Sequence, residues 1–163
     1  PAIERAQNAN VKVRGYLSCV IECPYDGAVS PYDVAELAQR LVELGCYEVS
    51  LGDTIGSANV DTTREMLTAV LRVLAPSQVA GHFHDTNGQA LANIQCSLDF
   101  GVRTFDTSIG GLGGCLYAPG SAGNVDTRAV VECLRGLGYR LDLDLAALKV
   151  AETIALQIAR KAA

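Results

Sequence analysis

Hydrophobic and polar positions alternate along the chain between two periods. Short runs rich in β-branched and aromatic residues are typical of strands, and they lie at 11–17, 46–51, 79–84 and 102–108. Between these runs, apolar residues recur every three to four positions, as expected for one face of a helix. The clearest such face consists of Val34, Leu37, Ala38 and Leu41. The pattern therefore predicts strands that alternate with helices.

Capping residues indicate where the predicted helices begin and end. Ser30 as N-cap and Pro31 at the first helical position predict a helix start, and Gly45 suits a left-handed helix end. A capping-box spacing over 62–65 predicts the start of the next helix. Asp144 is placed to cap the last one. Together these signals predict helices at 31–44, 62–74, 89–100, 127–135 and 145–161.

Strand–helix alternation predicts an α/β fold with a parallel sheet and helices outside it. A doubly wound sheet and a (β/α)8 barrel both fit, but four strands make a poor doubly wound sheet and half of a barrel. No Gly-x-Gly-x-x-Gly directly follows the first predicted strand, which argues against a dinucleotide site. Residues 1–163 are expected to form a single domain.

Polar residues gather where the predicted strands end. They are Ser50, Asp53, Thr54, His82, His84, Asp85, Thr86, Asp106 and Ser108. Both kinds of parallel fold carry their chemistry at the carboxyl ends of the strands. The pattern therefore locates a site without choosing between the two folds.

Composition narrows the range of partners and compartments. Hydrophobic residues make up 49% of the 163 and charged ones 19%, enough for a sizeable core. A net charge of −5 argues against a nucleic-acid or polybasic membrane surface, and no apolar run reaches the roughly 18 residues of a membrane-spanning helix. The 6 cysteines are scattered, which favours reduced thiols and a cytoplasmic protein. A transit peptide upstream of Pro1 would indicate the mitochondrial matrix instead.

His82 and His84 are the 2 histidines of the chain. Because side chains alternate along a strand, both point to the same face. Two neighbouring imidazoles form the start of a divalent-metal site, whereas the simpler alternative is a pair of polar residues at a strand mouth. The Asp85-Thr86 that follows favours metal binding. A magnesium or manganese site would need further, oxygen ligands.

Three other residues could take part in chemistry. Asp53 could orient a bound ligand or shuttle a proton, or it could equally cap a helix or close a turn. Cys115 ends the glycine-rich stretch 110–115, whose backbone freedom suits close approach to a ligand, although a flexible linker would look similar. Asn124 offers an amide oxygen to a hard cation, or is simply a turn residue beside Gly123.

Three segments together resemble the 3-hydroxy-3-methylglutaryl-CoA lyase family. The similarity runs from about residue 11 to residue 138, with the segments in family order and spacing. The most specific is the glycine-rich loop that ends in cysteine. The segments are Ser-Leu-Gly-Asp-Thr-Ile-Gly at 50–56, Gly-His-Phe-His-Asp-Thr-Asn-Gly-Gln-Ala-Leu-Ala-Asn at 81–93, and Gly-Leu-Gly-Gly-Cys-Leu-Tyr-Ala-Pro-Gly-Ser-Ala-Gly-Asn at 111–124.

The resemblance implies a fold, a reaction and a site. The family is a (β/α)8 barrel, and this chain would cover strands five to eight and the C-terminal helices. It cleaves 3-hydroxy-3-methylglutaryl-CoA, an acyl-CoA substrate, to acetyl-CoA and acetoacetate with Mg²⁺ or Mn²⁺. By motif, His82, His84 and Asn124 correspond to metal ligands and Cys115 to a proton-transferring thiol. Asp53 corresponds to an active-site acid, and His82 is also expected to assist proton movement.

Departures from the family pattern leave alternatives open. Gly110 and Leu116 stand where the family usually has Ala and Pro, which allows a related acyl-CoA lyase or a Claisen-condensing relative. The family's first-strand Arg-Asp pair and second-strand Glu are absent. We therefore expect the chain to pair with a missing N-terminal half or a second copy, as a homo-oligomer, because half a barrel leaves open edges. Alone, it is expected to be inactive, and a non-catalytic half-barrel module is the alternative.

Overall fold

The structure is a computed structural model that describes residues 2–114 and 123–162. Its elements alternate along the chain much as the hydrophobic pattern predicts. In order they are α1 (Ala2–Asn8), β1 (Val13–Leu17), β2 (Glu22–Cys23), β3 (Gly27–Ala28), α2 (Pro31–Glu43), β4 (Cys46–Asp53), α3 (Val60–Val70), the 3₁₀ turn η1 (Pro76–Gln78), β5 (Val79–Phe83), α4 (Ala90–Asp99), β6 (Thr104–Asp106), the 3₁₀ turn η2 (Ile109–Gly111), α5 (Thr127–Gly136) and α6 (Leu145–Ala162).

One sheet organises the fold. Strands β1, β4, β5 and β6 are all parallel and lie side by side in chain order, while β2 and β3 form a separate short antiparallel pair. A doubly wound sheet reverses its strand order at a switch point, whereas a barrel adds each strand beside the previous one. Of the two folds that the sequence allows, the observed strand order therefore agrees with the barrel.

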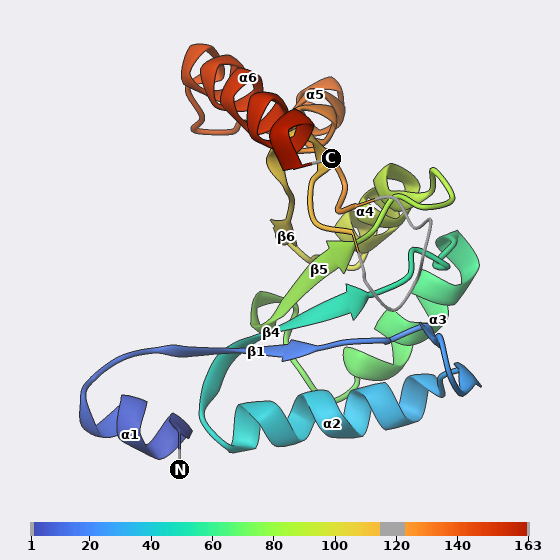
Figure 1. Ribbon diagram of the computed structural model, residues 1–163. Coiled ribbons are helices and arrows are strands. Elements are labelled where there is room, and N and C mark those ends of the chain that lie inside the picture. The colour runs from blue at the N-terminus through green and yellow to red at the C-terminus, as the bar shows by residue number, and fades with distance from the viewer. Residues whose placement is uncertain (1, 115–122, 163) are drawn as a thin grey trace.

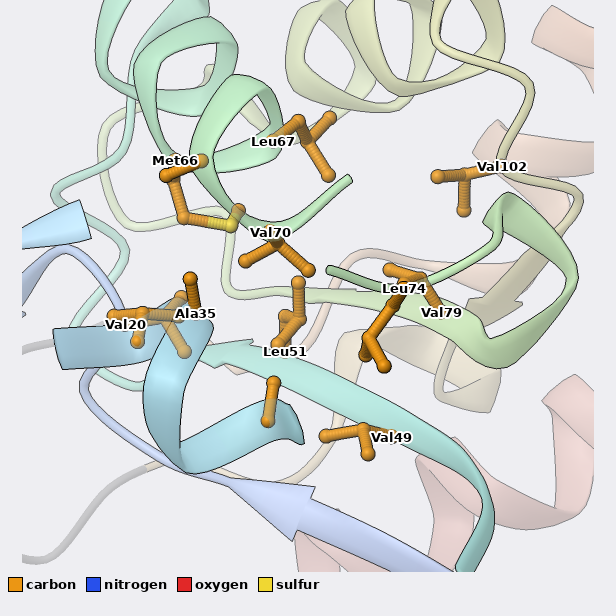
Figure 2. Packing of buried hydrophobic residues seen from close by; sticks show 13 residues of the cluster. Val20, Ala35, Val49, Leu51, Met66, Leu67, Val70, Leu74, Val79 and Val102 are labelled. Atoms are coloured by element: carbon orange, nitrogen blue, oxygen red, sulfur yellow. The ribbon is translucent and has the colours of Figure 1, made fainter. Parts of the chain in front are cut away.

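Helices cover one face of this sheet and bury the main hydrophobic core against it. Figure 1 shows α2 and α3 side by side along that face, with α5 and α6 together beyond β6. Val49 and Leu51 of β4 and Val79 of β5 point toward these helices, as Figure 2 shows. They pack on Ala35 of α2 and Val70 of α3. A second cluster, which includes Phe83, Ile94 and Val130, joins β5, α4 and α5.

The predicted helix boundaries are correct for α2 and shifted for α3. The side chain of Ser30 accepts a hydrogen bond from the Tyr32 N–H, and Gly45 has φ +109° beyond the helix end. Helix α3 begins one turn earlier than the 62–65 spacing predicts, because Asn59 is its N-cap and Thr62 completes the capping box. The Asn59 side chain satisfies two backbone N–H groups that the predicted start would have left open.

Helix α1 and the short strands β2 and β3 were not predicted, and all three lack a hydrophobic pattern. Helix α1 has no buried residue, and β2 and β3 are two residues each. Strand β6 is also shorter than the predicted 102–108. In the part of the chain that the structure describes, five cysteines are free thiols. No helix there combines the length and hydrophobicity that crossing a membrane requires.

Candidate functional site

Charged side chains line the face of the sheet opposite the helices. Arg14 of β1 donates through Nε to Glu48 Oε1 of β4 at 2.6 Å, and through Nη1 to the two carboxylate oxygens of Asp106 at 2.8 and 3.0 Å. Asp106 lies on β6, three strand positions from β1, which is about 14 Å in a flat sheet. The direct contact therefore requires a curved sheet, and we call this side the concave face.

Asp106 is the centre of the polar contacts on the concave face. Its Oδ2 also accepts from Ser50 Oγ at 2.6 Å and lies 3.2 Å from His82 Nδ1. Burial acts to raise the pKa of Asp106, but the hydrogen bonds from His82, Ser50 and Arg14 outweigh it and lower the pKa to about 2. Burial likewise opposes the charge of Arg14, yet its bonds to Glu48 and Asp106 raise its pKa. These charges are therefore fixed at neutral pH.

The structure brings His82, His84 and Asn124 together at the end of β5. The two imidazole rings are neighbours, with centroids 5.6 Å apart. Asn124 pairs with His84 through an antiparallel backbone bridge, which two flanking hydrogen bonds extend: Val125 N–H to Phe83 O, and Asp85 N–H to Gly123 O. The shared face predicted from the i, i+2 spacing of the histidines is thus observed, and a residue 40 positions away joins them.

These three residues suit a divalent cation. Within residues 2–114 and 123–162, no group of three His, Cys, Asp or Glu side chains could hold a metal. The Asn124 amide nitrogen donates to the Leu112 carbonyl at 3.0 Å, which turns its oxygen away from that carbonyl. Two imidazole nitrogens and one amide oxygen form a partial coordination set for a cation that accepts mixed ligands. Their role as ligands stays a prediction.

The glycine-rich segment leads to the predicted thiol. Gly110, Gly111 and Gly113 all have positive φ, from +65° to +96°, a region that only glycine adopts readily. The Gly110 N–H donates to Asp126, which also caps α5, so this turn is tied to the fold. Cys115 itself lies outside the described residues. The unusual backbone expected for this stretch is therefore confirmed up to residue 113, and the role of Cys115 stays a prediction.

Asp53 lies on the other side of the sheet from the histidines. It shares strand parity with Val49 and Leu51, and its side chain is fully enclosed. Its two carboxylate oxygens accept from the Ser57 and Ala58 N–H groups, each at 3.0 Å. Burial raises the pKa of Asp53, and these backbone bonds work against that rise. The sequence left open whether Asp53 acts in chemistry or closes a turn, and these contacts are those of a residue that closes a turn.

Two hollows meet at His82 on the concave face. One of about 450 Å³ is bordered by Tyr16, His82 and Asp106, and a second of about 150 Å³ by Tyr16, His82 and His84. Tyr16 borders both hollows and is 62% exposed, while its hydroxyl accepts from Arg14. A hollow of about 400 Å³ between α2 and α3 lies on the helix side of the sheet, away from both histidines.

Sequence reasoning missed Arg14 and Glu48 and did not single out Asp106. Each is a charged residue within or at the end of a strand, at an inward position that alternates with apolar ones. That alternation is a usable signal, because a charge in the middle of a buried strand needs a partner. The partner itself could not be read from the sequence, since Arg14 and Asp106 are 92 positions apart.

Comparison with known proteins places this geometry in a family. The sequence model of the HMGL-like family matches residues 1–154. The hydroxymethylglutaryl-CoA lyase of Pseudomonas mevalonii is 52% identical over 147 residues, which is 90% of this chain and 49% of that protein. The 3-hydroxy-3-isohexenylglutaryl-CoA/hydroxy-methylglutaryl-CoA lyase of Pseudomonas aeruginosa is 51% identical, over 91% of this chain and 49% of that protein.

A solved structure gives the same result in three dimensions. The crystal structure of the HMG-CoA lyase from Brucella melitensis superposes with a TM-score of 0.94 at 52% identity, over 97% of this chain and 56% of that one. The chain thus spans about half the length of the curated relatives it matches. Mammalian relatives of the same name are described as mitochondrial or as cytoplasmic.

Proposed function

The chain belongs to the HMGL-like family, and on this basis we propose that it acts in the cleavage of 3-hydroxy-3-methylglutaryl-CoA to acetyl-CoA and acetoacetate. The single observation that carries the proposal is the meeting of His82, His84 and Asn124 beside the two hollows of the concave face. A carbon–carbon lyase of this type needs a cation site next to a space for the acyl group, and the neighbouring candidate ligands and hollows at the end of β5 support that arrangement.

We propose that a second half completes the site, either a missing N-terminal half-barrel or a second copy in a homo-oligomer. This chain would then supply strands five to eight. Two features support the proposal. The sheet ends at β1 and β6 in the described residues, and both edges could pair with further strands. The Nη2 group of Arg14 is buried with no acceptor among those residues, a cost of about 1–3 kcal/mol that an added acceptor would remove.

His82, His84 and Asn124 would hold Mg²⁺ or Mn²⁺ in this proposal. When bound, such a cation polarises the oxygens of the substrate and favours the alkoxide of its tertiary hydroxyl. The acyl group would occupy the hollows beside Tyr16. The hydroxyl loses its proton to a base, the bond between the carbinol carbon and the thioester methylene breaks, and the electron pair forms the enolate of acetyl-CoA.

The enolate carbon then accepts a proton, which we assign to Cys115. The Cys115 side chain would donate this proton directly and be reprotonated from water. Asp53 would support the site through the turn at 53–58 that its carboxylate holds. The family resemblance also gives His82 a part in proton movement. One of its two ring nitrogens lies against Asp106, so a single nitrogen remains for either binding the cation or carrying a proton.

A second substrate class has a specific observation in its favour. The Pseudomonas aeruginosa relative is named for two substrates that differ only in the group at carbon 3, a methyl or an isohexenyl chain. The larger hollow, about 450 Å³, is bordered by Tyr16, His82 and Asp106, and its size would leave room for a longer group. A substrate panel with both compounds would separate a methyl-specific lyase from one that accepts longer chains.

The test measures acetoacetate release in two forms of the protein. The purified chain is assayed with 3-hydroxy-3-methylglutaryl-CoA and Mg²⁺. In parallel, a chimera is assayed in which this chain replaces the part of the Pseudomonas mevalonii lyase that it matches. We expect release by the chimera, and a loss of more than about 100-fold in the His84→Ala chimera. An inactive chimera that folds as well as the parent lyase would refute the proposal.

The thiol role has its own comparison. Cys115→Ala in the chimera should lower turnover while leaving Mn²⁺ affinity unchanged, because the thiol is not a proposed ligand. Cys133→Ala is the matched control, since Cys133 is a partly buried free thiol on α5. Full turnover by the Cys115→Ala chimera would remove the thiol from the mechanism.

A further inference from the structure

We infer that Asp106, held by Arg14 and Ser50, is a positioning residue that fixes the tautomer of His82, with the proton on Nδ1 and a lone pair on Nε2. Metal-binding histidines commonly donate a hydrogen bond from the N–H of their second ring nitrogen to a carboxylate. This bond orients the ring and makes the ligand nitrogen more basic. The inference rests on the proposed function only in making His82 a ligand. The tautomer itself can be measured without any metal.

The directions of the hydrogen bonds decide the tautomer. Asp106 Oδ2 accepts from Ser50 Oγ at 2.6 Å and from Arg14 Nη1 at 3.0 Å, and a carboxylate offers only lone pairs. His82 Nδ1 lies 3.2 Å from the same oxygen. A lone pair on Nδ1 would face another lone pair, so Nδ1 must carry the proton. A neutral imidazole has one N–H, and Nε2 is therefore bare.

Three strands hold the Asp106 carboxylate in place. Asp106 is the register partner of His82 across β5 and β6, so the two side chains start as neighbours on the concave face. Arg14 contacts both carboxylate oxygens from β1 and is itself held by Glu48 of β4 at 2.6 Å. The carboxylate cannot turn away from the imidazole without breaking the bonds to Arg14 and Ser50.

One consequence concerns the second role suggested for His82. With Nδ1 committed to Asp106 and Nε2 to the cation, the ring has no free lone pair. His82 is then a ligand and does not take the proton of the substrate hydroxyl. The base for that step is a different group.

The first measurement is nitrogen NMR of the metal-free chain labelled with ¹⁵N-histidine. The chain has only 2 histidines, so the spectrum contains two imidazole patterns, and His84→Gln assigns the remaining one to His82. We expect the Nδ1–H tautomer for His82 in the unmodified chain. In Asp106→Asn, the Arg14 N–H groups should keep the amide oxygen on their side, so that the amide NH₂ faces His82. Nδ1 then has to accept a hydrogen bond, so the proton should move to Nε2. Ser50→Ala is the matched control, because it removes a donor to Oδ2 and keeps the acceptor that His82 needs.

The second measurement is the Mn²⁺ affinity of the chimera with the Pseudomonas mevalonii lyase, determined from the electron paramagnetic resonance signal of the free ion. Asp106→Asn should raise the Kd about 10- to 100-fold, and Ser50→Ala should raise it by less than about tenfold. His82 with its proton on Nε2 in the unmodified chain would overturn the inference, whether or not the variants fold. An unchanged tautomer in a folded Asp106→Asn chain would overturn it as well. The expected tautomers in the chain, together with a folded chimera that binds no Mn²⁺, would refute the proposed function and leave the positioning by Asp106 standing.

Discussion

Replacing Asp53 with alanine should destabilise the fold by about 2–4 kcal/mol. The carboxylate accepts from the Ser57 and Ala58 N–H groups at 3.0 Å each, and the side chain is fully enclosed. Each buried N–H that loses its acceptor costs about 1–3 kcal/mol. Burial raises the pKa of Asp53, which shows that enclosing its charge carries a cost. Removing the buried charge therefore offsets part of the lost stability, and the net change in the free energy of unfolding is smaller than the sum of the two lost hydrogen bonds.

The assay is urea unfolding at pH 7 followed by far-UV circular dichroism, because the chain has no Trp. Asp61→Ala is the matched control, since Asp61 is an exposed carboxylate in the first turn of α3, a few residues from the same turn. We expect that control to cost about 0.3–1 kcal/mol. A free energy of unfolding for Asp53→Ala within about 0.5 kcal/mol of the unmodified chain would refute the structural role argued for this carboxylate.

Three further predictions test other parts of the structure. Gly81→Ala should lower the free energy of unfolding by about 1–3 kcal/mol in the same urea assay, because its Cβ would lie 2.8 Å from the Phe83 ring and 3.0 Å from the Phe105 ring. Asp144→Ala should cost about 0.5–2 kcal/mol and reduce the helical dichroism, because the Asp144 carboxylate accepts from two N–H groups at the start of α6. Despite burial, hydrogen bonds hold the pKa of Asp106 at about 2 instead of 3.8. The destabilisation caused by Asp106→Asn should therefore be largest above pH 3.8 and should be lost as the pH falls through about 2. If the free energies of unfolding of the unmodified chain and of Asp106→Asn differ by the same amount over this pH range, the Asp106 charge does not contribute to stability.

Local signals predicted the fold where one residue determines one boundary. Ser30 with Pro31 located the start of α2, and Asp144 that of α6, because a cap acts on the N–H groups next to it. The start of α3 was misplaced because 62–65 has the spacing of a capping box while Asn59, one turn earlier, makes the actual contacts. Helix α1 gave no signal, since none of its residues is buried.

The sequence predicted which side chains of the candidate site share a face of the sheet, but it did not predict the hydrogen bonds and ion pairs between distant strands. The i, i+2 spacing was enough to place His82 and His84 on one face, because strand geometry is periodic. The contact of Arg14 with Asp106 depends on sheet curvature, which no local pattern encodes. Asp53 shows the reverse case, in which a strand-end acid has the sequence context of a catalytic group and the contacts of a turn residue.

The separation of apolar and charged faces has a consequence for building hybrid enzymes. In the described residues, both hydrophobic clusters involve helices packed on the sheet, while Arg14, Glu48 and Asp106 face the opposite side. On that side, a complementary piece would meet this chain mainly through hydrogen bonds and ion pairs, and it would pair with the strand edges. Such a junction does not require two cores to interlock side chain by side chain, so halves from different homologues should recombine into folded enzymes more readily than cuts made through a shared core would allow.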